Sequence, residues 1–196
     1  MRSPFENGAD MMPPLPQLQT PRLLLRPLVE QDAEAVFAYC SNPNVSRYTL
    51  WEPHRSLDDA LAYIRDYAFP KYELGVPEPF AITLKEEGDR VIGTVGAFWV
   101  SEANRCMEIA YAIAEPYWGQ GLVAEAARAV RDFVFETYSV ERLQCRCKAE
   151  NAPSARVMEK LGMTREGTLR ASLYHRDRFW DMHYYSLLRS EWERLR

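Results

Sequence analysis

The stretch Glu115–Val130, EPYWGQGLVAEAARAV, places two glycines between a strand-like segment and a helix-like segment. The run before it, Met107–Ala114 (MEIAYAIA), is apolar and bounded by turn residues, which is typical of a buried strand. The first turn of a helix carries free N–H groups and a partial positive charge, and Gly119 and Gly121 let an anion approach them closely. After the glycines, apolar residues recur at helical spacing at Val123, Ala126, Ala127, Val130 and Val134. The stretch therefore predicts a strand, a turn and a helix that together hold a phosphate group.

Glycine pairs also occur at turns that need a positive φ angle and bind nothing, and this is the alternative interpretation. Two specific phosphate motifs are excluded. The segment lacks the Gly-Lys-Ser/Thr ending of a P-loop. It also lacks the third glycine of a dinucleotide fingerprint, and no second strand with an acidic end follows. The turn alone indicates anion binding without identifying the ligand.

The composition limits the class of protein. A chain of 196 residues with 47% hydrophobic residues suits one domain with a sizeable core. A net charge of −4 argues against a nucleic-acid partner, and no apolar run approaches the roughly 18 residues of a membrane helix. The proline-rich start, residues 1–18, has no apolar signal core and is expected to be a loose leader before a domain spanning residues 19–196. We therefore expect a cytoplasmic protein that does not bind membranes.

The four cysteines, Cys40, Cys106, Cys145 and Cys147, match no spacing of a zinc site. On a strand, Cys145 and Cys147 would point to the same face. We interpret all four as small apolar residues in a reducing compartment, so no metal is expected. A metal site or a catalytic thiol is the alternative.

The rest of the chain predicts strands interleaved with helices. The expected strands are 20–27, 79–85, 91–100, 107–114, 142–148, 163–169 and 178–188. The expected helices are 31–40, 57–72 with Ser56 as N-cap, the stretch from the glycine turn to Tyr138, and 153–161 ended by Gly162. Residues 42–54 contain two prolines and are expected to form a loop. The order β α α β β β α β α β β predicts an α/β fold, one domain with a mixed sheet and helices on both faces.

This order and several segments resemble the GNAT N-acetyltransferase superfamily, and within it the RimJ/RimL-like branch of ribosomal-protein-alanine acetyltransferases. Thr20–Leu28 (TPRLLLRPL) is similar to the opening strand of that branch, and Tyr117–Ala126 (YWGQGLVAEA) to its acetyl-CoA pyrophosphate loop. Ala149–Met163 (AENAPSARVMEKLGM) is similar to its second cofactor motif. Gly167–Arg170 and the tail at Asp181–Trp192 are also alike. The resemblance covers most of the chain.

Three positions in the cofactor motifs depart from the common pattern of the superfamily. Trp118 stands where Gln or Arg is usual, which favours the RimJ/RimL-like branch, Val123 stands at the last small-residue position of the loop motif, and Met163 replaces a Phe. The resemblance implies a GNAT-like domain whose central sheet is splayed at the cofactor strand. It also implies a direct transfer from acetyl-CoA to a primary amine, with no covalent enzyme intermediate, and it allows a homodimer.

The resemblance implies a set of residues that contact acetyl-CoA. Backbone groups of the loop would hold the pyrophosphate, and the strand end near Ile113 and Ala114 would pair with the pantetheine arm and polarise the thioester carbonyl. Asn151 would touch the same arm, although it also suits the N-cap of the helix that starts near Pro153. The expected cofactor-binding residues are Ile113, Ala114, Gly119, Gln120, Gly121, Leu122, Val123, Ala124 and Asn151.

Two residues are candidates for proton transfer. Glu108 is a carboxylate in an otherwise apolar strand, where it would take the proton of the amine; alternatively it binds solvent or an arginine. Many relatives protonate the leaving thiolate with a tyrosine, but Met158 stands at that position here. The resemblance implies that Ser154 substitutes for it, although a serine at a helix start also bonds to backbone. Glu125 is a weaker candidate for the base, because a surface charge that complements the helix dipole explains it better.

Other residues have ordinary explanations. We interpret Phe98, Trp99 and Tyr111 as core aromatics rather than ligand contacts. Solvated helix faces explain the basic residues as well as contact with the 3′-phosphate of the cofactor would: Arg128, Arg131, Arg156 and Lys160. His54, His175 and His183 form no spaced motif, though His175 lies near the hairpin that borders the acceptor site in the resemblance.

We therefore expect an acetyl-CoA-dependent N-acetyltransferase that acts on a primary amine, for example a protein or peptide N-terminus. A small amine, an amino acid or an antibiotic is the alternative acceptor. A non-catalytic acyl-CoA-binding module is the alternative of another class. The expected acceptor loops, 54–74 and 169–181, mix charges of both signs, so no strongly charged acceptor is implied.

Overall fold

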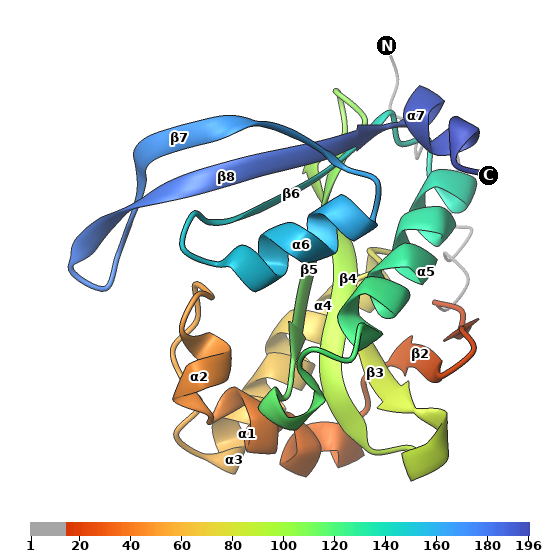
Figure 1. Cartoon of the computed structure of the whole chain (residues 1–196). Helices are drawn as coiled ribbons and strands as arrows, with labels where there is room; N and C mark the ends of the chain where they lie inside the picture. Colours follow the sequence, from red (N-terminus) through yellow and green to blue (C-terminus); the bar gives the residue numbers. More distant parts are fainter. Residues whose placement is uncertain (1–14) are drawn as a thin grey trace.

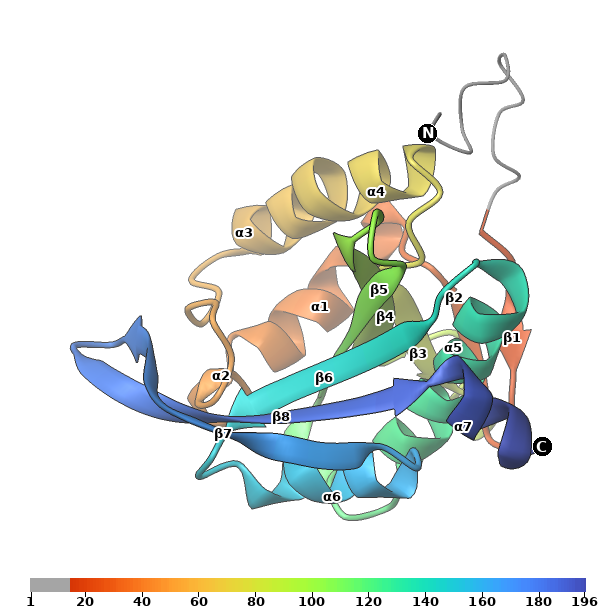
Figure 2. The ribbon, with the colours of Figure 1, turned by 90° about the horizontal axis from the view of Figure 1, so that it is seen from above.

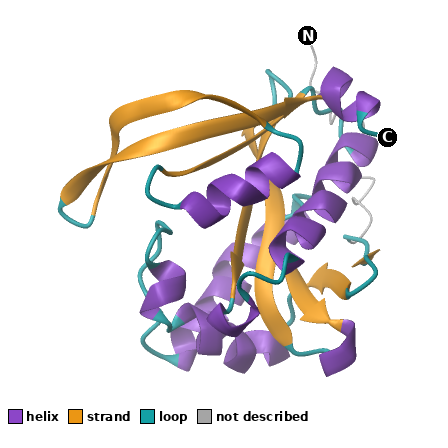
Figure 3. Cartoon of the chain, viewed as in Figure 1, coloured by secondary structure: helices purple, strands orange, loops and turns teal. Residues whose placement is uncertain are grey.

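The computed structural model describes residues 15–196, and its strands form one mixed sheet (Figure 1, Figure 3). The strands are β1 (Leu18–Gln19), β2 (Leu23–Pro27), β3 (Phe80–Leu84), β4 (Val91–Ser101), β5 (Cys106–Ile113), β6 (Arg142–Lys148), β7 (Thr164–His175) and β8 (Arg178–Leu188). The α-helices are α1 (Ala33–Cys40), α2 (Pro43–Ser46), α3 (Leu57–Ala62), α4 (Phe69–Glu73), α5 (Leu122–Thr137), α6 (Ala152–Lys160) and α7 (Arg189–Arg194). The spatial order is β1-β2-β3-β4-β5-β6-β8-β7.

Helices cover both faces of this sheet, which confirms the predicted fold class. In Figure 2, α1, α3 and α4 lie on one side of β4 and β5, and α5 and α6 lie on the other. Neighbouring strands pair antiparallel except β5 and β6, which are parallel. Because parallel neighbours need a crossover, the long helix α5 connects these two strands across one face.

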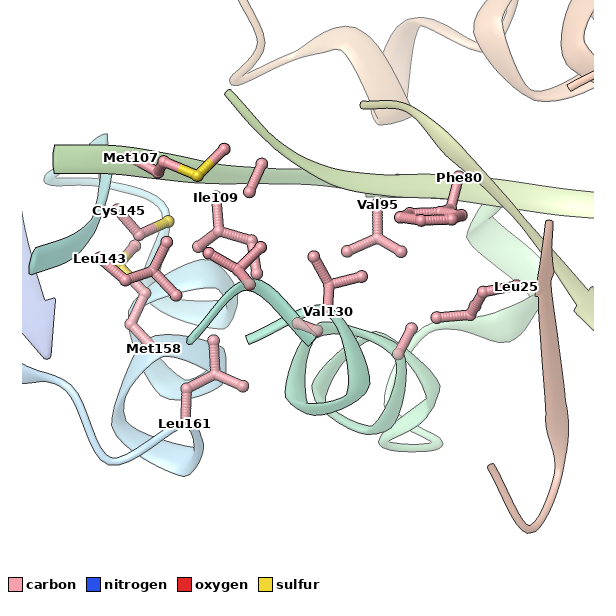
Figure 4. Packing of buried hydrophobic residues seen from close by; sticks show 14 of the residues in the cluster. Leu25, Phe80, Val95, Met107, Ile109, Val130, Leu143, Cys145, Met158 and Leu161 are labelled. Atoms are coloured by element: carbon pink, nitrogen blue, oxygen red, sulfur yellow. The ribbon is translucent and has the colours of Figure 1, made fainter. Parts of the chain in front are cut away.

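The larger core lies between the sheet and the pair α5 and α6 (Figure 4). The apolar residues that the sequence placed at helical spacing form the buried face of α5. Ala126, Ala127, Val130 and Val134 are all 0% exposed. Opposing them are Val95 on β4, Ile109 on β5, Leu143 on β6 and Met158 on α6. A second core lies under α1 and α3. All four cysteines are buried free thiols, as the interpretation as small apolar residues requires.

The sheet opens between β5 and β6, as the resemblance predicted. Their ladder joins Cys106 to Arg142, Met107 to Leu143 and Glu108 to Gln144, and it ends there. Beyond this point β5 keeps its pairing with β4 as far as Ile113, and β6 keeps its pairing with β8 as far as Lys148. The inner edges of the two strands therefore separate toward the glycine turn.

The segment between α1 and β3 differs from its prediction. The predicted loop 42–54 contains the one-turn helix α2, because the side chain of Asn42 accepts a hydrogen bond from the amide of Asn44 and Pro43 occupies the first turn. The predicted helix 57–72 begins as expected, with the Ser56 hydroxyl accepting from the amide of Asp59 at 3.3 Å.

The same helix then continues as three joined pieces, α3, the π-helical segment η2 (Tyr63–Ala68) and α4. The amide of Phe69 bonds to the carbonyl of Ile64, five residues back. Pro70 follows at once, and its ring would clash with the carbonyl four residues back in a regular α-helix. The wider turn before Pro70 avoids this clash, which the apolar spacing alone did not indicate.

The C-terminal pair of strands is longer than predicted. β7 runs beyond residue 169 to His175, and a two-residue turn follows in which Arg176 and Asp177 have φ angles of 53° and 58°. Such a turn usually contains glycine or asparagine, so the sequence carried a weak hairpin signal here. β1 and α7 were also not predicted.

The predicted leader, residues 1–18, lies largely outside the described residues. Of its last residues, Leu15 packs in the larger core and Leu18 pairs with Leu25 in the sheet. Among residues 15–196, no helix is long and apolar enough to cross a membrane.

Glu166 ties β7 to the rest of the sheet. Its carboxylate accepts hydrogen bonds from Arg142 on β6, at 2.6 Å and 2.7 Å, and from the hydroxyl of Ser186 on β8. The bonds from Arg142 and Ser186 lower the pKa of Glu166 from 4.5 to about 2. Because the folded state holds the ionised form, this tie stabilises the fold above the ordinary pKa and is lost as the pH falls toward 2.

We therefore predict that Glu166→Gln lowers the urea midpoint at neutral pH. It should also flatten the decline of that midpoint between about pH 4.5 and about pH 2, because the ionisable group is gone. Ser186→Ala, which removes one donor, should give an intermediate profile. Parallel profiles for the variant and the wild type would contradict the tie.

Candidate active site

A cleft of about 1190 Å³ lies where β5 and β6 separate. One half is lined by the glycine turn, the first turn of α5 and the start of α6. The other half is lined by the α1-side face of β4, β5 and β6 and by residues between 39 and 67. Of the predicted site residues, Ala114 and Gln120 do not line the cleft and all the others do. The fold therefore brings the glycine turn, the segment around Asn151 and Glu108 together in one cleft.

The glycine turn leaves the start of α5 open. Gly119 and Gly121 have φ angles of 75° and 77°, and Gly121 is the N-cap residue, which has no side chain to cap the helix. The first intrahelical bond runs from the amide of Glu125 to the carbonyl of Gly121. The amides of Leu122, Val123 and Ala124 precede it and have no acceptor within the helix. The positive end of α5 and these amides form an anion site.

An ion pair from Arg22, which immediately precedes β2, supports this turn. Arg22 donates to the carbonyl of Gln120 at 3.1 Å and to the carboxylate of Glu125 at 2.7 Å. Glu125 also accepts from the hydroxyl of Thr20 at 2.6 Å. Burial opposes ionisation of Glu125, but the bonds from Thr20 and Arg22 prevail and lower its pKa. Glu125 thus links α5 to the segment before β2, and it lies in the first turn of α5, where its predicted charge complements the helix dipole.

The inner edge of β5 presents alternate backbone groups to the cleft. The amide of Ala114 donates to the carbonyl of Ile92 at 2.8 Å, so it is already bonded on the β4 side. In an antiparallel pair such bonds alternate, which turns the backbone groups of Ile113 and Tyr111 toward the gap. The carbonyl of Ile113 accepts from the indole of Trp118 at 2.9 Å. Trp118 therefore fixes the glycine turn to the strand end, and Ile113 rather than Ala114 offers an amide to the gap.

Ser154 lies beside a tyrosine hydroxyl from the opposite strand. The phenolic oxygen of Tyr111 is 2.9 Å from the Ser154 hydroxyl and donates to the Ser154 carbonyl at 3.2 Å. Burial raises the pKa of Tyr111 well above its usual value, so the phenol keeps its proton. Asn151 is the N-cap of α6, accepting from the amide of Ser154 at 3.3 Å, and it lines the cleft. Tyr111 packs against the larger core, as predicted, and it also lines the cleft, which the interpretation as a core aromatic did not indicate.

Glu108 lies at the point where the β5–β6 ladder ends. It is 7% exposed, and its two oxygens accept from Arg146 at 2.9 Å and from Gln144 at 2.8 Å. Its side chain shares a strand face with Ala110 and Ala112, which line the same half of the cleft. The bond from Arg146 agrees with the alternative interpretation of the sequence, in which Glu108 binds an arginine.

A buried lysine closes the cleft on the hairpin side. Lys148 is 1% exposed, its ammonium lies 3.0 Å from Nδ1 of His175, and it lies 4.1 Å from the centre of the Trp180 ring. Burial, with the charges of Arg176 and Arg178, lowers the pKa of Lys148. Lys148 joins β6 to the hairpin, and its position at a strand end gave no signal in the sequence.

The remaining candidates separate clearly. Arg131 donates hydrogen bonds to the carbonyl of Leu161 and to the carboxylate of Asp132, whereas Arg156 and Lys160 line the cleft. Trp99 packs in the core as predicted, but Phe98 lines the cleft. Among residues 15–196, no group of histidine, cysteine and carboxylate side chains is arranged to hold a metal ion.

Comparisons with known proteins agree with this geometry. The family model of the acetyltransferase (GNAT) domain matches residues 22–164. The chain is 33% identical over 175 residues to the uncharacterized N-acetyltransferase YnaD of Bacillus subtilis (strain 168), covering 89% of this chain and 98% of the relative. The crystal structure of an acetyltransferase (GNAT family) from Bacillus anthracis superposes with a TM-score of 0.80 at 28% identity, covering 89% of this chain and 99% of that one.

RimL, a ribosomal L7/L12 alpha-N-protein acetyltransferase solved in complex with coenzyme A, superposes with a TM-score of 0.79 over 88% of this chain and 98% of its own. Its identity to this chain is 17%, so the likeness is one of fold. Because the family match spans the opening strand, the glycine turn and the second motif in order, the chain belongs to the GNAT family and is an N-acetyltransferase, as its resemblance to the RimJ/RimL-like branch predicted.

Proposed function

We propose that this N-acetyltransferase uses acetyl-CoA and transfers its acetyl group to the primary amine at a protein or peptide N-terminus. The observation that supports acetyl-CoA as the acetyl donor is the uncapped start of α5 beside the gap between β5 and β6. A pyrophosphate suits the free amides of the helix, and an extended arm with amide groups suits the free strand edge. Coenzyme A has both parts, and Arg156 and Lys160 are the cations in reach of its 3′-phosphate.

When bound, acetyl-CoA supplies a thioester whose C–S bond breaks as the amine forms the new C–N bond. The chain would then polarise the carbonyl with a backbone amide, for which Ile113 is the residue turned toward the gap. The thiolate that leaves has a pKa of about 8.5, so a hydroxyl hydrogen bond stabilises it. Ser154 would give this bond, with the Tyr111 hydroxyl 2.9 Å away to hold it in orientation.

Glu108 is the carboxylate available for the proton of the amine. Both of its oxygens already accept a hydrogen bond, each keeps a further lone pair, and Glu108 lines the cleft together with Ala110 and Ala112. A water molecule between the amine and Glu108 would complete the transfer. Arg146 would keep the carboxylate in place during this step.

The acceptor is proposed from the family relationship and the shape of the second half of the cleft. The name of RimL describes an alpha-N-protein acetyltransferase, and its fold covers 88% of this chain. A protein N-terminus places one amine into the cleft and leaves the rest of the acceptor outside. On the β7–β8 hairpin, Leu173 and Tyr184 line the cleft and are partly exposed.

The first prediction concerns the glycine turn. Gly119→Ala should lower the affinity for coenzyme A by roughly 10-fold, because a Cβ and a strained φ angle disturb the amides that face the pyrophosphate. Gly88→Ala is the matched control: its φ of 73° is close to the 75° of Gly119, and in both places the Cβ would meet no described atom within 4 Å. Gly119→Ala should lose about 1 kcal/mol of stability, and Gly88→Ala at least as much, because its ψ of −147° lies in a region that only glycine adopts readily.

Calorimetric titration with coenzyme A and urea unfolding measure the two quantities separately. Equal affinity losses in both variants would mean that the effect is one of stability alone. In that case the turn would be a structural turn rather than a phosphate site.

The second prediction concerns the hydrogen bond to the leaving thiolate. Ser154→Ala should lower kcat by roughly 100-fold with little change in the KM for acetyl-CoA, and Tyr111→Phe should lower kcat in the same direction. The control Tyr138→Phe also removes a hydroxyl bonded to a carbonyl, here 2.7 Å from Gly75, outside the cleft. Unchanged kcat in Ser154→Ala would remove this residue from the reaction.

The proposed function itself is tested by the release of free CoA thiol with a panel of acceptors. Peptides with free N-termini should give turnover, and the same peptides with blocked N-termini should give none. Turnover on amino acids or polyamines with none on peptides would contradict a protein or peptide acceptor. Binding of coenzyme A without turnover on any amine would contradict transfer altogether.

A further inference from the structure

The acceptor half of the cleft has an aromatic wall, made by Trp51, His54, Tyr63 and Tyr67. Neighbouring rings are in contact along this wall: the ring centres are 6.0 Å apart for Trp51 and His54, and 6.3 Å apart for His54 and Tyr63. Tyr63 and Tyr67 are stacked at 5.3 Å with an angle of 19° between their planes. Trp51 and Tyr63 also pack against the second core, which contains residues of α1 and α3, and Figure 2 shows these two helices on one side of the sheet.

The π-helical segment η2 accounts for this stacking. In η2 the bonds span five residues, as the bond from the amide of Phe69 to the carbonyl of Ile64 shows, so one turn takes more residues than in an α-helix. Residues four apart, such as Tyr63 and Tyr67, therefore lie almost in line along the helix. The irregularity that the sequence did not predict is what builds the flat part of the wall.

Small residues on β5 face this wall. Ala110 and Ala112 line the cleft on the same strand face as Glu108, and both are partly exposed. We call the space between these two alanines and the aromatic wall the acceptor slot. It is bounded by flat rings on one side and by methyl groups on the other, with Glu108 at one end of its floor.

At the end of the slot away from Glu108, Lys71 and Glu78 form an ion pair. Its ammonium already occupies the place that a second positive charge on the acceptor would take. Glu78 is 6% exposed and accepts from the Tyr67 hydroxyl at 2.8 Å, and it forms an ion pair with Lys71. The ammonium of Lys71 lies 4.1 Å from the centre of the Tyr67 ring and 5.2 Å from that of Phe98. Aromatic faces beside a carboxylate favour a cation, and here the protein supplies that cation itself. An acceptor with a second positive charge would be repelled by Lys71.

His54 contributes a ring without a charge. Its Nδ1 is buried and has no hydrogen-bond partner among the described residues. Protonation would place a charged N–H at this buried position, and burial accordingly lowers the pKa of His54. The imidazole therefore acts in the wall as a neutral flat group between Trp51 and Tyr63.

We propose that the acceptor slot selects a monoamine whose side chain is an uncharged aromatic ring. This inference rests on the proposed function, because it takes the amine acceptor as given and names the group attached to it. Two sources carry this chemistry: a free arylalkylamine, and a peptide whose first residue is Phe, Tyr or Trp. In both, the ring lies between the wall and the alanines, and the amine lies on the Glu108 side.

The experiment compares matched acceptors by the release of CoA thiol. Phenethylamine is set against butylamine and spermidine, and one peptide is made with Phe, Ser or Ala as its first residue. The aromatic member of each set should have a kcat/KM at least about 10-fold higher, since ring contacts are gained only there. Preference within the free amines identifies one source and preference within the peptides the other, and either preference supports the inference.

Two variants test the residues themselves. Tyr67→Leu should lower the kcat/KM for phenethylamine more than that for butylamine and so remove most of the aromatic preference, because the ring contact is lost. Phe179→Leu is the control, an aromatic residue that is 65% exposed on the hairpin and does not line the cleft. Lys71→Met should raise the relative rate with spermidine, since it removes the resident cation from Glu78.

The outcomes separate the inference from the proposed function. Turnover of aromatic and aliphatic amines at equal rates would overturn the slot and leave the transferase intact. If no amine is turned over, the proposed function fails, and equilibrium binding to the CoA-loaded protein then decides the slot. Phenethylamine bound at least about 10-fold more tightly than butylamine would support it, and equal affinity would overturn it.

Discussion

β5 and β6 are hydrogen-bonded over three residue pairs and then run apart, while each keeps the partner on its outer side. A strand pair can open in this way only if the groups on the two inner edges find other partners, because unpaired buried amides cost free energy. Where the ladder ends, the carboxylate of Glu108 accepts from Gln144 and Arg146 and so links the two strands by side chains. Farther on, the Trp118 indole takes the carbonyl of Ile113. The residue proposed as the base is thus also part of what holds the opening in shape.

The cleft that results has two halves built on different principles. The half beside α5 uses backbone groups, so its chemistry depends on φ angles and on an uncapped helix start rather than on particular side chains. Arg22 and Glu125 hold that backbone in position from behind. The other half uses side chains from α2 to η2, from β5 and β6, and from the hairpin. The motifs of a family can therefore define the first half of the cleft closely and indicate nothing about the residues of the second half.

The same difference explains what the sequence predicted. The glycine turn, the helix after it and the Asn151 segment are local, and their spacing is readable because each residue acts on its near neighbours. Arg22 lies 98 positions before Gln120, and Tyr111 lies 43 positions before Ser154, so no spacing rule connects them. The π turn at Tyr63–Ala68 and the hairpin turn at Arg176 and Asp177 depart from the residue types on which such rules rest. The gap between β5 and β6 was predicted only from the resemblance. It depends on how strands far apart in the sequence pair across the sheet, which local spacing does not indicate.

Met158 bears on the chemistry because many relatives carry a tyrosine at its position. The methionine is 0% exposed and packs between α6 and the sheet, so it offers neither a hydroxyl nor an approach to the cleft. In the proposed reaction the missing hydroxyl is replaced from the facing strand, where Tyr111 comes within 2.9 Å of Ser154. A buried phenol is a weak acid and would not protonate a thiolate through an equilibrium at neutral pH. It would instead orient the Ser154 hydroxyl toward the sulfur, where the hydrogen bond stabilises the leaving thiolate, so that the pair, rather than either residue alone, would stand in for the single tyrosine.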